Sequence, residues 1–144
     1  MNTQAAVRPE ALNWSAENCT LGRAMDILGE KWTVVVLREV FLGIRRFEDL
    51  RVRTGIPRQV LTNRLAALVG HGLLRRSPYQ APGVRARDEY RLTDKGLDLM
   101  PMLLEMIAWS AKYDRKTAAG EDFVRRVRRD RDGLVKELRS ALTR

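Results

Sequence analysis

Residues 45–76 read RRFEDLRVRTGIPRQVLTNRLAALVGHGLLRR. The first part combines charged and apolar side chains as a short amphipathic helix does, and Gly55 predicts its end. Pro57 suits the first turn of a new helix, because the N–H that proline lacks has no helical partner there. We therefore predict two helices joined by a short turn, the second of which runs to residue 69 or 70.

The second predicted helix has one apolar side and one polar side. At 100° per residue, Leu61, Leu65 and Leu68 fall together, and short hydrogen-bonding residues lie opposite them. The helix contains no acidic residue, whereas a merely solvated face more often carries glutamate and lysine. Asn, Gln, Thr and Arg are the side chains that read base edges in a major groove. The candidate reading residues are Arg58, Gln59, Thr62, Asn63 and Arg64.

Two short strands are predicted after this helix, at residues 73–76 and 89–92. The Pro- and Gly-containing segment 78–87 connects them and is longer than a tight hairpin turn. A short helix, a turn, a polar-faced helix and a hairpin are the parts of a winged helix-turn-helix domain, whose second helix enters the major groove. The candidate contacts to the DNA backbone or minor groove are Arg45, Arg46, Arg85 and Arg87. A winged domain used only for protein contacts is the alternative.

The charge of the chain is concentrated in the same region. The 144 residues carry a formal net charge of +9, from 27 Lys and Arg against 18 Asp and Glu. Residues 45–92 hold eleven basic and four acidic side chains, so most of the excess lies there. A localised positive field indicates a polyanionic partner, nucleic acid first and an acidic membrane surface second. The longest aliphatic run, residues 34–37, is far shorter than the roughly 20 residues that cross a bilayer, so we expect no membrane span.

Helices are also predicted before the winged region. One is short, begins with Asn18 or Thr20 as its cap and ends at Gly29. The next covers residues 31–42, although its β-branched residues also allow a buried strand.

Further helices are predicted after the hairpin. Thr93 is expected to cap a helix that continues to about residue 113, with Pro101 kinking or splitting it. Gly120 interrupts the chain, and a last helix is expected over residues 121–142. We therefore predict a mainly α-helical protein with a small β-hairpin.

Several short motifs stand in order along residues 19–113. They are CTL at 19–21, ILGEKWT at 27–33, RFEDL at 46–50, LTNRL at 61–65, GLL at 72–74 and YRLT at 90–93, with Gly96 and Pro101 after them. Together these motifs resemble the HxlR-type transcriptional regulators. The chain departs from the family's pattern at Thr20, where proline is usual, and at Glu30, where glycine is usual.

The resemblance implies a homodimeric bacterial winged-helix protein, related to the MarR regulators, that binds operator DNA. It also implies that the helix after the wing and the N-terminal helix supply the dimer contacts. The expected parts are a flexible arm (residues 1–13), a winged helix-turn-helix domain with dimerisation helices (14–113) and a basic helical extension (114–144). We expect the extension to be a solvated amphipathic helix, or else to touch flanking phosphate or extend the dimer.

Cys19 is the single cysteine, which excludes an intramolecular disulfide framework. Some members of the family sense oxidants or electrophiles through a cysteine at this position, and a thiol at a helix N-terminus is reactive when its pKa is lowered. Sensing through one thiol per chain needs an intersubunit disulfide, a mixed disulfide or an adduct. The alternative is an inert, small core residue. His71, the single histidine, is expected to cap the reading helix or to neighbour a phosphate.

We predict a sequence-specific transcriptional regulator that acts in the cytoplasm as a homodimeric repressor on pseudo-palindromic double-stranded DNA. The prediction includes a redox or electrophile response through Cys19, and a small molecule or an oxidant as the effector. The alternative is a basic, nucleoid-type protein that binds nucleic acid without sequence choice. An enzyme built on the thiol is not expected, because the sequence offers it no paired base. No cofactor or metal is expected, since a zinc site built from Cys and His normally needs four ligands.

Overall fold

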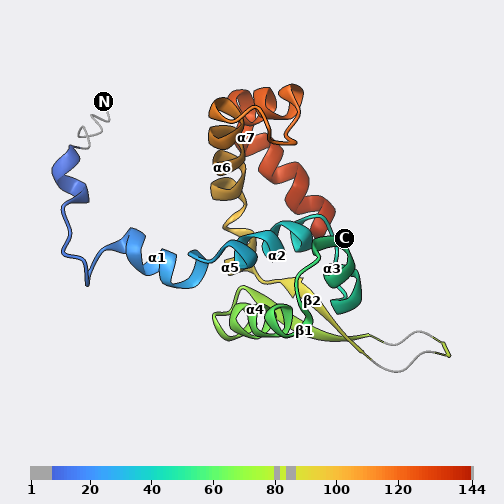
Figure 1. The fold of residues 1–144 in the computed structure, drawn as a ribbon. Coiled ribbons are helices and arrows are strands. Elements are labelled where there is room, and N and C mark those ends of the chain that lie inside the picture. The colour runs from blue at the N-terminus through green and yellow to red at the C-terminus, as the bar shows by residue number, and fades with distance from the viewer. Residues whose placement is uncertain (1–7, 80–81, 84–86, 144) are drawn as a thin grey trace.

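The computed structural model describes residues 8–79, 82–83 and 87–143. It is mainly α-helical with one two-stranded antiparallel hairpin, as the sequence predicted (Figure 1). The elements in chain order are the 3-10 helix η1 (Pro9–Leu12), α1 (Thr20–Leu28), α2 (Lys31–Phe41), α3 (Phe47–Thr54), α4 (Arg58–Gly70), β1 (Leu74–Tyr79), β2 (Arg87–Leu92), α5 (Asp94–Leu97), α6 (Met100–Tyr113) and α7 (Glu121–Leu142).

The main hydrophobic core lies around α2, with α3, α4 and the hairpin packed against it. Val36 and Leu37 of α2 have no exposed surface, and Leu61 of α4 has none either. The β-branched run of α2 is helical and not a buried strand, because its apolar residues recur at helical spacing along one side of the core. A second apolar cluster joins α6 to α7.

The turn between α3 and α4 depends on a left-handed residue. Gly55 has a φ of 70°, which a side chain rarely adopts and which ends α3 at the predicted place. Ile56 follows Gly55 and is buried, so its side chain anchors the turn between α3 and α4 in the core. Pro57 is the N-cap of α4, which then runs to Gly70.

Helix α3 begins two residues later than the sequence suggested. Arg45 and Arg46 are extended beside β2, where the Tyr90 backbone N–H donates to the Arg45 carbonyl at 2.8 Å and Arg46 forms a bridge with Glu89. The prediction that the helix starts at Arg45 was wrong because this pairing with a distant strand is not visible in the local sequence pattern.

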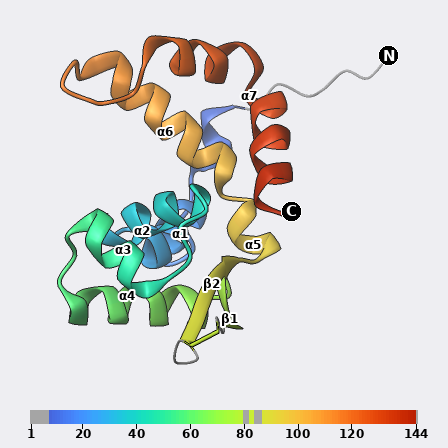
Figure 2. The same ribbon diagram turned by 90° about the vertical axis from the view of Figure 1, so that its right-hand side faces the viewer.

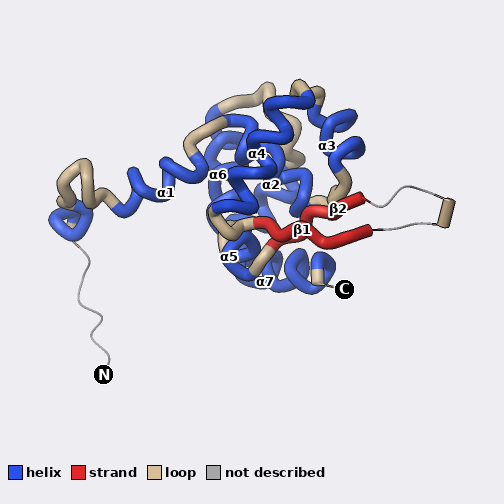
Figure 3. The backbone as a smooth tube through the Cα atoms, turned by 90° about the horizontal axis from the view of Figure 1, so that it is seen from below, coloured by secondary structure: helices blue, strands red, loops and turns tan. Residues whose placement is uncertain are grey.

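The hairpin is longer than predicted. Its register pairs Leu74 with Leu92 at the base and Tyr79 with Arg87 at the far end. The hairpin projects beyond the helices as a wing (Figure 3). Arg85 belongs to the connection between the strands and lies outside the described residues.

Pro101 splits the helical region after the wing. Thr93 caps α5 as predicted, since its hydroxyl accepts from the Gly96 backbone N–H at 3.1 Å and donates to the Gly72 carbonyl at 2.5 Å. Gly96 has no space for a side chain, because a Cβ there would lie 2.3 Å from the Leu73 carbonyl oxygen. Helix α6 starts anew with Pro101 in its first turn, where proline is tolerated.

Helix α7 covers the end of α6 and then turns back toward α5 (Figure 2). Asp130 interrupts it with a φ of −152° and a ψ of 61°, a kink that the sequence did not predict. On either side of the kink, Val127 and Leu134 are buried against α6, together with Val124, while Phe123 is 37% exposed.

Helix α1 extends away from the rest of the chain (Figure 1). Leu28 is the buried residue of this nine-residue helix. Its N-cap is Cys19, whose Sγ accepts from the Gly22 backbone N–H at 3.3 Å, and not Asn18 or Thr20 as predicted. The helix starts one residue later than an Asn18 cap requires and one earlier than a Thr20 cap requires.

Candidate nucleic-acid interface

Helix α4 presents an uncharged, hydrogen-bonding surface to solvent. Leu61, Leu65 and Leu68 are buried as predicted, and Gln59, Thr62 and Asn63 are exposed. The Gln59 Nε2 donates to the Asn63 Oδ1 at 3.0 Å. This contact aligns the two amides along the helix and leaves the Gln59 Oε1 and the Asn63 Nδ2 available to a base edge. The Thr62 hydroxyl donates to the Arg58 carbonyl at 3.0 Å, so its remaining acceptor capacity faces outward.

Arg58 stands at the start of α4 and is held by α3. Its Nη2 lies 2.8 Å from Glu48 Oε1, and its guanidinium lies 5.4 Å from the Phe47 ring centroid. Hydrogen bonds from Arg51 and Arg58 lower the pKa of Glu48, so this carboxylate stays charged beside them. The Arg58 side chain is still 64% exposed, which leaves donors free for an anion or a guanine edge.

Arg64 occupies the opposite flank of α4. It forms an ion pair with Glu30, the N-cap residue of α2, and its side chain is 29% exposed. The guanidinium is thereby drawn from the outward face of α4 toward α2. Four of the predicted reading residues therefore share one exposed surface, and Arg64 lies at its edge.

Arg46 connects α3 to the wing. Its guanidinium carbon lies 3.6 Å from the centroid of the Tyr79 ring, within the range of a cation–π contact, and its Nε lies 3.5 Å from Glu89 Oε1. Arg45, the preceding residue in the chain, points elsewhere and donates to the Leu142 carbonyl at 3.4 Å. The structure therefore separates two arginines that the sequence placed together.

The described part of the wing is basic. Arg87 is exposed at the start of β2, and Arg76 of β1 donates to the Tyr90 hydroxyl at 2.9 Å. This hydrogen bond to the Tyr90 hydroxyl raises the pKa of Arg76, with a smaller contribution from Asp88. Arg76 was missed by the sequence analysis, although its position opposite Tyr90 could have been found from a correct strand register.

A buried carboxylate orients α3 relative to α2. Glu39 is 2% exposed and receives Arg38 at 2.8 Å and Arg53 at 2.5 Å. Burial acts to raise the pKa of Glu39, but the hydrogen bonds from Arg53 and Arg38 outweigh it, so this pKa lies below its ordinary value of 4.5. The charged Glu39 thus joins the first helix of the helix-turn-helix pair to the central helix of the core.

His71 is the C-cap residue of α4, one of the two roles predicted for it. Its carbonyl accepts from Lys95 Nζ at 2.7 Å, which ties the end of α4 to α5. In the part of the chain that the structure describes, no helix is long and apolar enough to span a membrane.

Known proteins resemble this chain in sequence. The sequence model of the HxlR-like helix-turn-helix family matches residues 27–118. An HTH-type transcriptional regulator of Mycobacterium tuberculosis is 43% identical over 97 residues, which are 67% of this chain and 60% of that protein. The match therefore spans less than two thirds of the relative's length.

Solved structures agree with the sequence match. PA1607, described as a candidate transcription factor, has a TM-score of 0.63 and 32% identity, and the alignment covers 72% of this chain and 71% of that one. The redox regulator HypR in its reduced form has a TM-score of 0.53 and 26% identity, with coverage of 64% of this chain and 90% of that one.

Proposed function

The chain belongs to the HxlR-like helix-turn-helix family of transcriptional regulators, and from this premise we propose that it is a homodimeric, sequence-specific repressor. The observation that carries the proposal is the outward face of α4. This face combines aligned amides and a hydroxyl and carries no acidic residue. The opposite face of α4 is fixed in the core by buried leucines. These are the properties that direct readout in a major groove requires.

The proposal assigns a role to the exposed polar and basic residues of the candidate interface. Gln59, Thr62 and Asn63 contact base edges, and Arg58 contacts a guanine or a phosphate at the start of α4. Arg46 and Arg87 contact the DNA backbone or the minor groove from the wing side, and Arg85 keeps the same role as a prediction. Arg64 is assigned no base contact, because its side chain is only 29% exposed and is drawn toward Glu30 of α2. Arg45 was predicted to contact the backbone or the minor groove, and it is left out of the reading surface because it points toward the Leu142 carbonyl.

The proposed dimer uses α1 and α6. Large apolar side chains on these helices are exposed: Leu21 by 68%, Met25 by 44%, Met106 by 46% and Trp109 by 70%. Tyr113 extends this surface, with its ring centroid 6.1 Å from that of Trp109. A second copy of the chain, related by a two-fold axis, would cover both surfaces. Two-fold symmetry predicts half-sites about one helical turn apart on the DNA.

Cys19 is the proposed site of a redox or electrophile response. Its Sγ accepts a hydrogen bond from the Gly22 N–H, and it lies at the start of the helix assigned to the dimer. Oxidation of Cys19 to an intersubunit disulfide, or its alkylation, would alter the N-cap of α1, where Sγ now accepts from the Gly22 N–H. Loss of the oxidant effect in Cys19→Ser, with DNA binding by the reduced protein unchanged, is the expected result.

Fluorescence anisotropy tests the DNA proposal. The duplex upstream of the protein's own gene is compared with a scrambled duplex of the same composition across a salt series. We expect a preference of about a thousandfold or more that persists as salt rises. Equal and steeply salt-dependent affinities would favour the nucleoid-type alternative.

Sedimentation velocity tests the dimer. Trp109→Glu places a charge on the exposed surface of α6, and we expect it to convert the dimer to a monomer. Arg115→Glu, an exposed residue just beyond α6, is the matched control. A monomeric parent protein would contradict the proposed assembly.

A further inference from the structure

A second group of arginines surrounds a cavity away from the exposed face of α4. The cavity has a volume of about 460 Å³ and lies between the base of the wing, the start of α5 and the C-terminal end of α7. Arg45, Arg75 and Arg91 line it together with Asp94. Three guanidinium groups around one small cavity indicate a site for an anion.

The arrangement of the two wing arginines supports this interpretation. Arg75 and Arg91 are directly opposite each other in the β1–β2 register. Like charges at such positions are destabilising unless something offsets them. Arg91 has Glu89 at 3.2 Å, but Glu89 is shared with Arg46. Among the described residues, the side chain of Arg75 has neither a hydrogen bond nor an ion pair.

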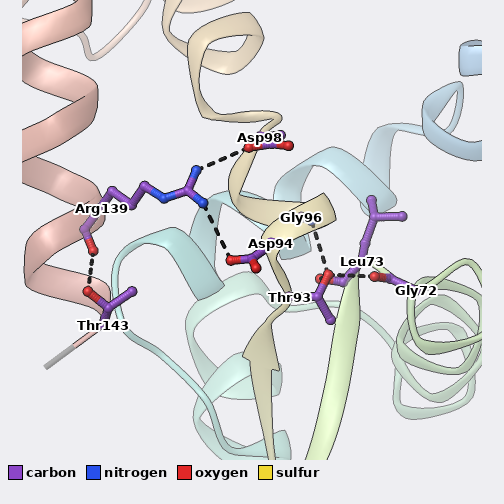
Figure 4. A network of polar contacts seen from close by, with 8 residues as sticks. All are labelled: Gly72, Leu73, Thr93, Asp94, Gly96, Asp98, Arg139 and Thr143. Atoms are coloured by element: carbon purple, nitrogen blue, oxygen red, sulfur yellow. Dashed lines mark hydrogen bonds and ion pairs between the residues drawn. The ribbon is translucent and has the colours of Figure 1, made fainter.

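The acidic groups near the cavity are largely engaged by other arginines. Arg139 of α7 lies 3.4 Å from Asp94 and 3.1 Å from Asp98, and this network anchors α7 to α5 (Figure 4). Five guanidinium groups, those of Arg45, Arg46, Arg75, Arg91 and Arg139, therefore face three carboxylates, those of Glu89, Asp94 and Asp98. An excess of positive charge remains, and it is concentrated at the wing.

The rest of the lining is suited to a short aliphatic body. Val40, Leu92, Leu97 and Leu142 contribute apolar surface, and Thr93 and Thr143 contribute hydroxyl groups. The last turn of α7, with Leu142 and Thr143, forms one wall of the cavity. This wall lies outside residues 27–118, the part of the chain that matches the family.

We propose that the cavity between the wing base and α7 binds a small organic anion, a carboxylate or phosphate monoester with a short aliphatic body. Arg75 and Arg91 hold the anionic group from the wing, and Arg45 holds it from the segment before α3. The aliphatic body lies against Leu92 and Leu142. The bound anion offsets the repulsion between the paired arginines and joins the wing to the C-terminal helix.

Calorimetric titration of the DNA-free full chain at constant ionic strength tests the proposal. The probes are isovalerate, isopentyl phosphate and the neutral isovaleramide. We expect saturable binding of at least one of the two anions and none of the amide; which anion binds identifies the preferred group. Equal binding of all three probes, or of none, would overturn the proposal.

Two substitutions locate the site. Arg75→Gln is expected to weaken binding of the anion about tenfold or more, and Arg91→Gln is expected to do the same. Arg128→Gln removes the same charge from an exposed position on α7 and should leave binding unchanged. Circular dichroism confirms that each variant is folded. An unchanged affinity in both folded wing variants would contradict the assignment.

The same variants separate a small anion from DNA phosphate. If these arginines serve DNA instead, Arg75→Gln would lower the affinity for any duplex, reduce the salt slope by about one, and no probe would bind. That outcome would overturn the anion site. Because the titration contains no DNA, its result does not depend on whether the protein recognises an operator.

Discussion

Helices α4 and α7 both carry arginines, but these charges have different surroundings. On α7, Arg125, Arg126 and Arg139 form ion pairs with Asp122, Glu137 and the Asp94–Asp98 pair. On α4, the outward face carries amides and a hydroxyl, and the two arginines stand at its flanks. The number of basic residues therefore does not distinguish α4 as an interface, whereas its outward face of aligned amides and a hydroxyl does set it apart from α7.

The contrast also distinguishes the roles of the two helices. Helix α4 is packed into the main core, and α7 is packed on α6 in the second cluster. The paired arginines of α7 support the interpretation of the extension as a solvated amphipathic helix, whose apolar face packs on α6. Arg128 and Arg129 are both exposed. A contact between these two residues and flanking DNA phosphate therefore remains a prediction.

The largest expected effect is a loss of folding stability when buried side chains of α4 and α7 are shortened. Leu65→Ala in α4 should cost about 2–5 kcal/mol of the free energy of unfolding, because it leaves a cavity in the main core. Val127→Ala in α7 removes fewer atoms from the smaller cluster and should cost about 1–2 kcal/mol. Urea denaturation measures both values. Equal costs would contradict the expected difference between the two apolar clusters.

The next largest effect is a loss of DNA discrimination when exposed side chains of α4, but not of α7, are replaced. Asn63→Ala should reduce discrimination between operator and scrambled duplex by about 1–3 kcal/mol, because it removes donors and acceptors that read a base. The double substitution of Arg128 and Arg129 by Gln should leave this ratio unchanged. Anisotropy with both duplexes provides the measurement. If the ratio survives in Asn63→Ala and falls in the α7 variant, the proposed reading surface is on the wrong helix.

A smaller effect is expected for a contact to the DNA backbone. Arg46→Gln should weaken binding to every duplex alike and lower the salt slope by about one. Arg125→Gln removes an equal charge from α7, where Asp122 already engages it, and should change the slope less. Titrations between low and moderate salt determine the slope. A selective loss for the operator would instead assign base readout to Arg46.

The smallest expected effect is a pH dependence of stability that arises from Glu39. Its pKa is lowered in the folded protein, so its contribution is present above the ordinary value of 4.5 and is lost as pH falls through the folded-state pKa. Glu39→Gln should reduce the loss of stability below pH 4.5. Urea denaturation at a series of pH values tests this. An unaltered pH profile would show that the Glu39 contacts with Arg38 and Arg53 do not contribute this dependence.

The local sequence pattern predicted most of the secondary structure. Gly55 and Pro57 placed the turn between α3 and α4, Thr93 was identified as a cap, and Pro101 separated α5 from α6. The two faces of α4 were also correct. These features depend on helical periodicity, on caps and on the backbone limits of glycine and proline, all of which act within a few residues.

The tertiary structure decided which side chains meet. Arg45 and Arg46 are neighbours in the chain, yet one reaches Leu142 and the other Tyr79. The partners of Arg58 and Arg64 come from α3 and from the start of α2, and the arginine-lined cavity combines the wing with α7. Such contacts join residues as many as 97 positions apart, and they form only when packing of the apolar faces has brought the helices and the wing together. The sequence by itself therefore determined the elements, the fold family and the face of α4, whereas packing determined how the charges are paired.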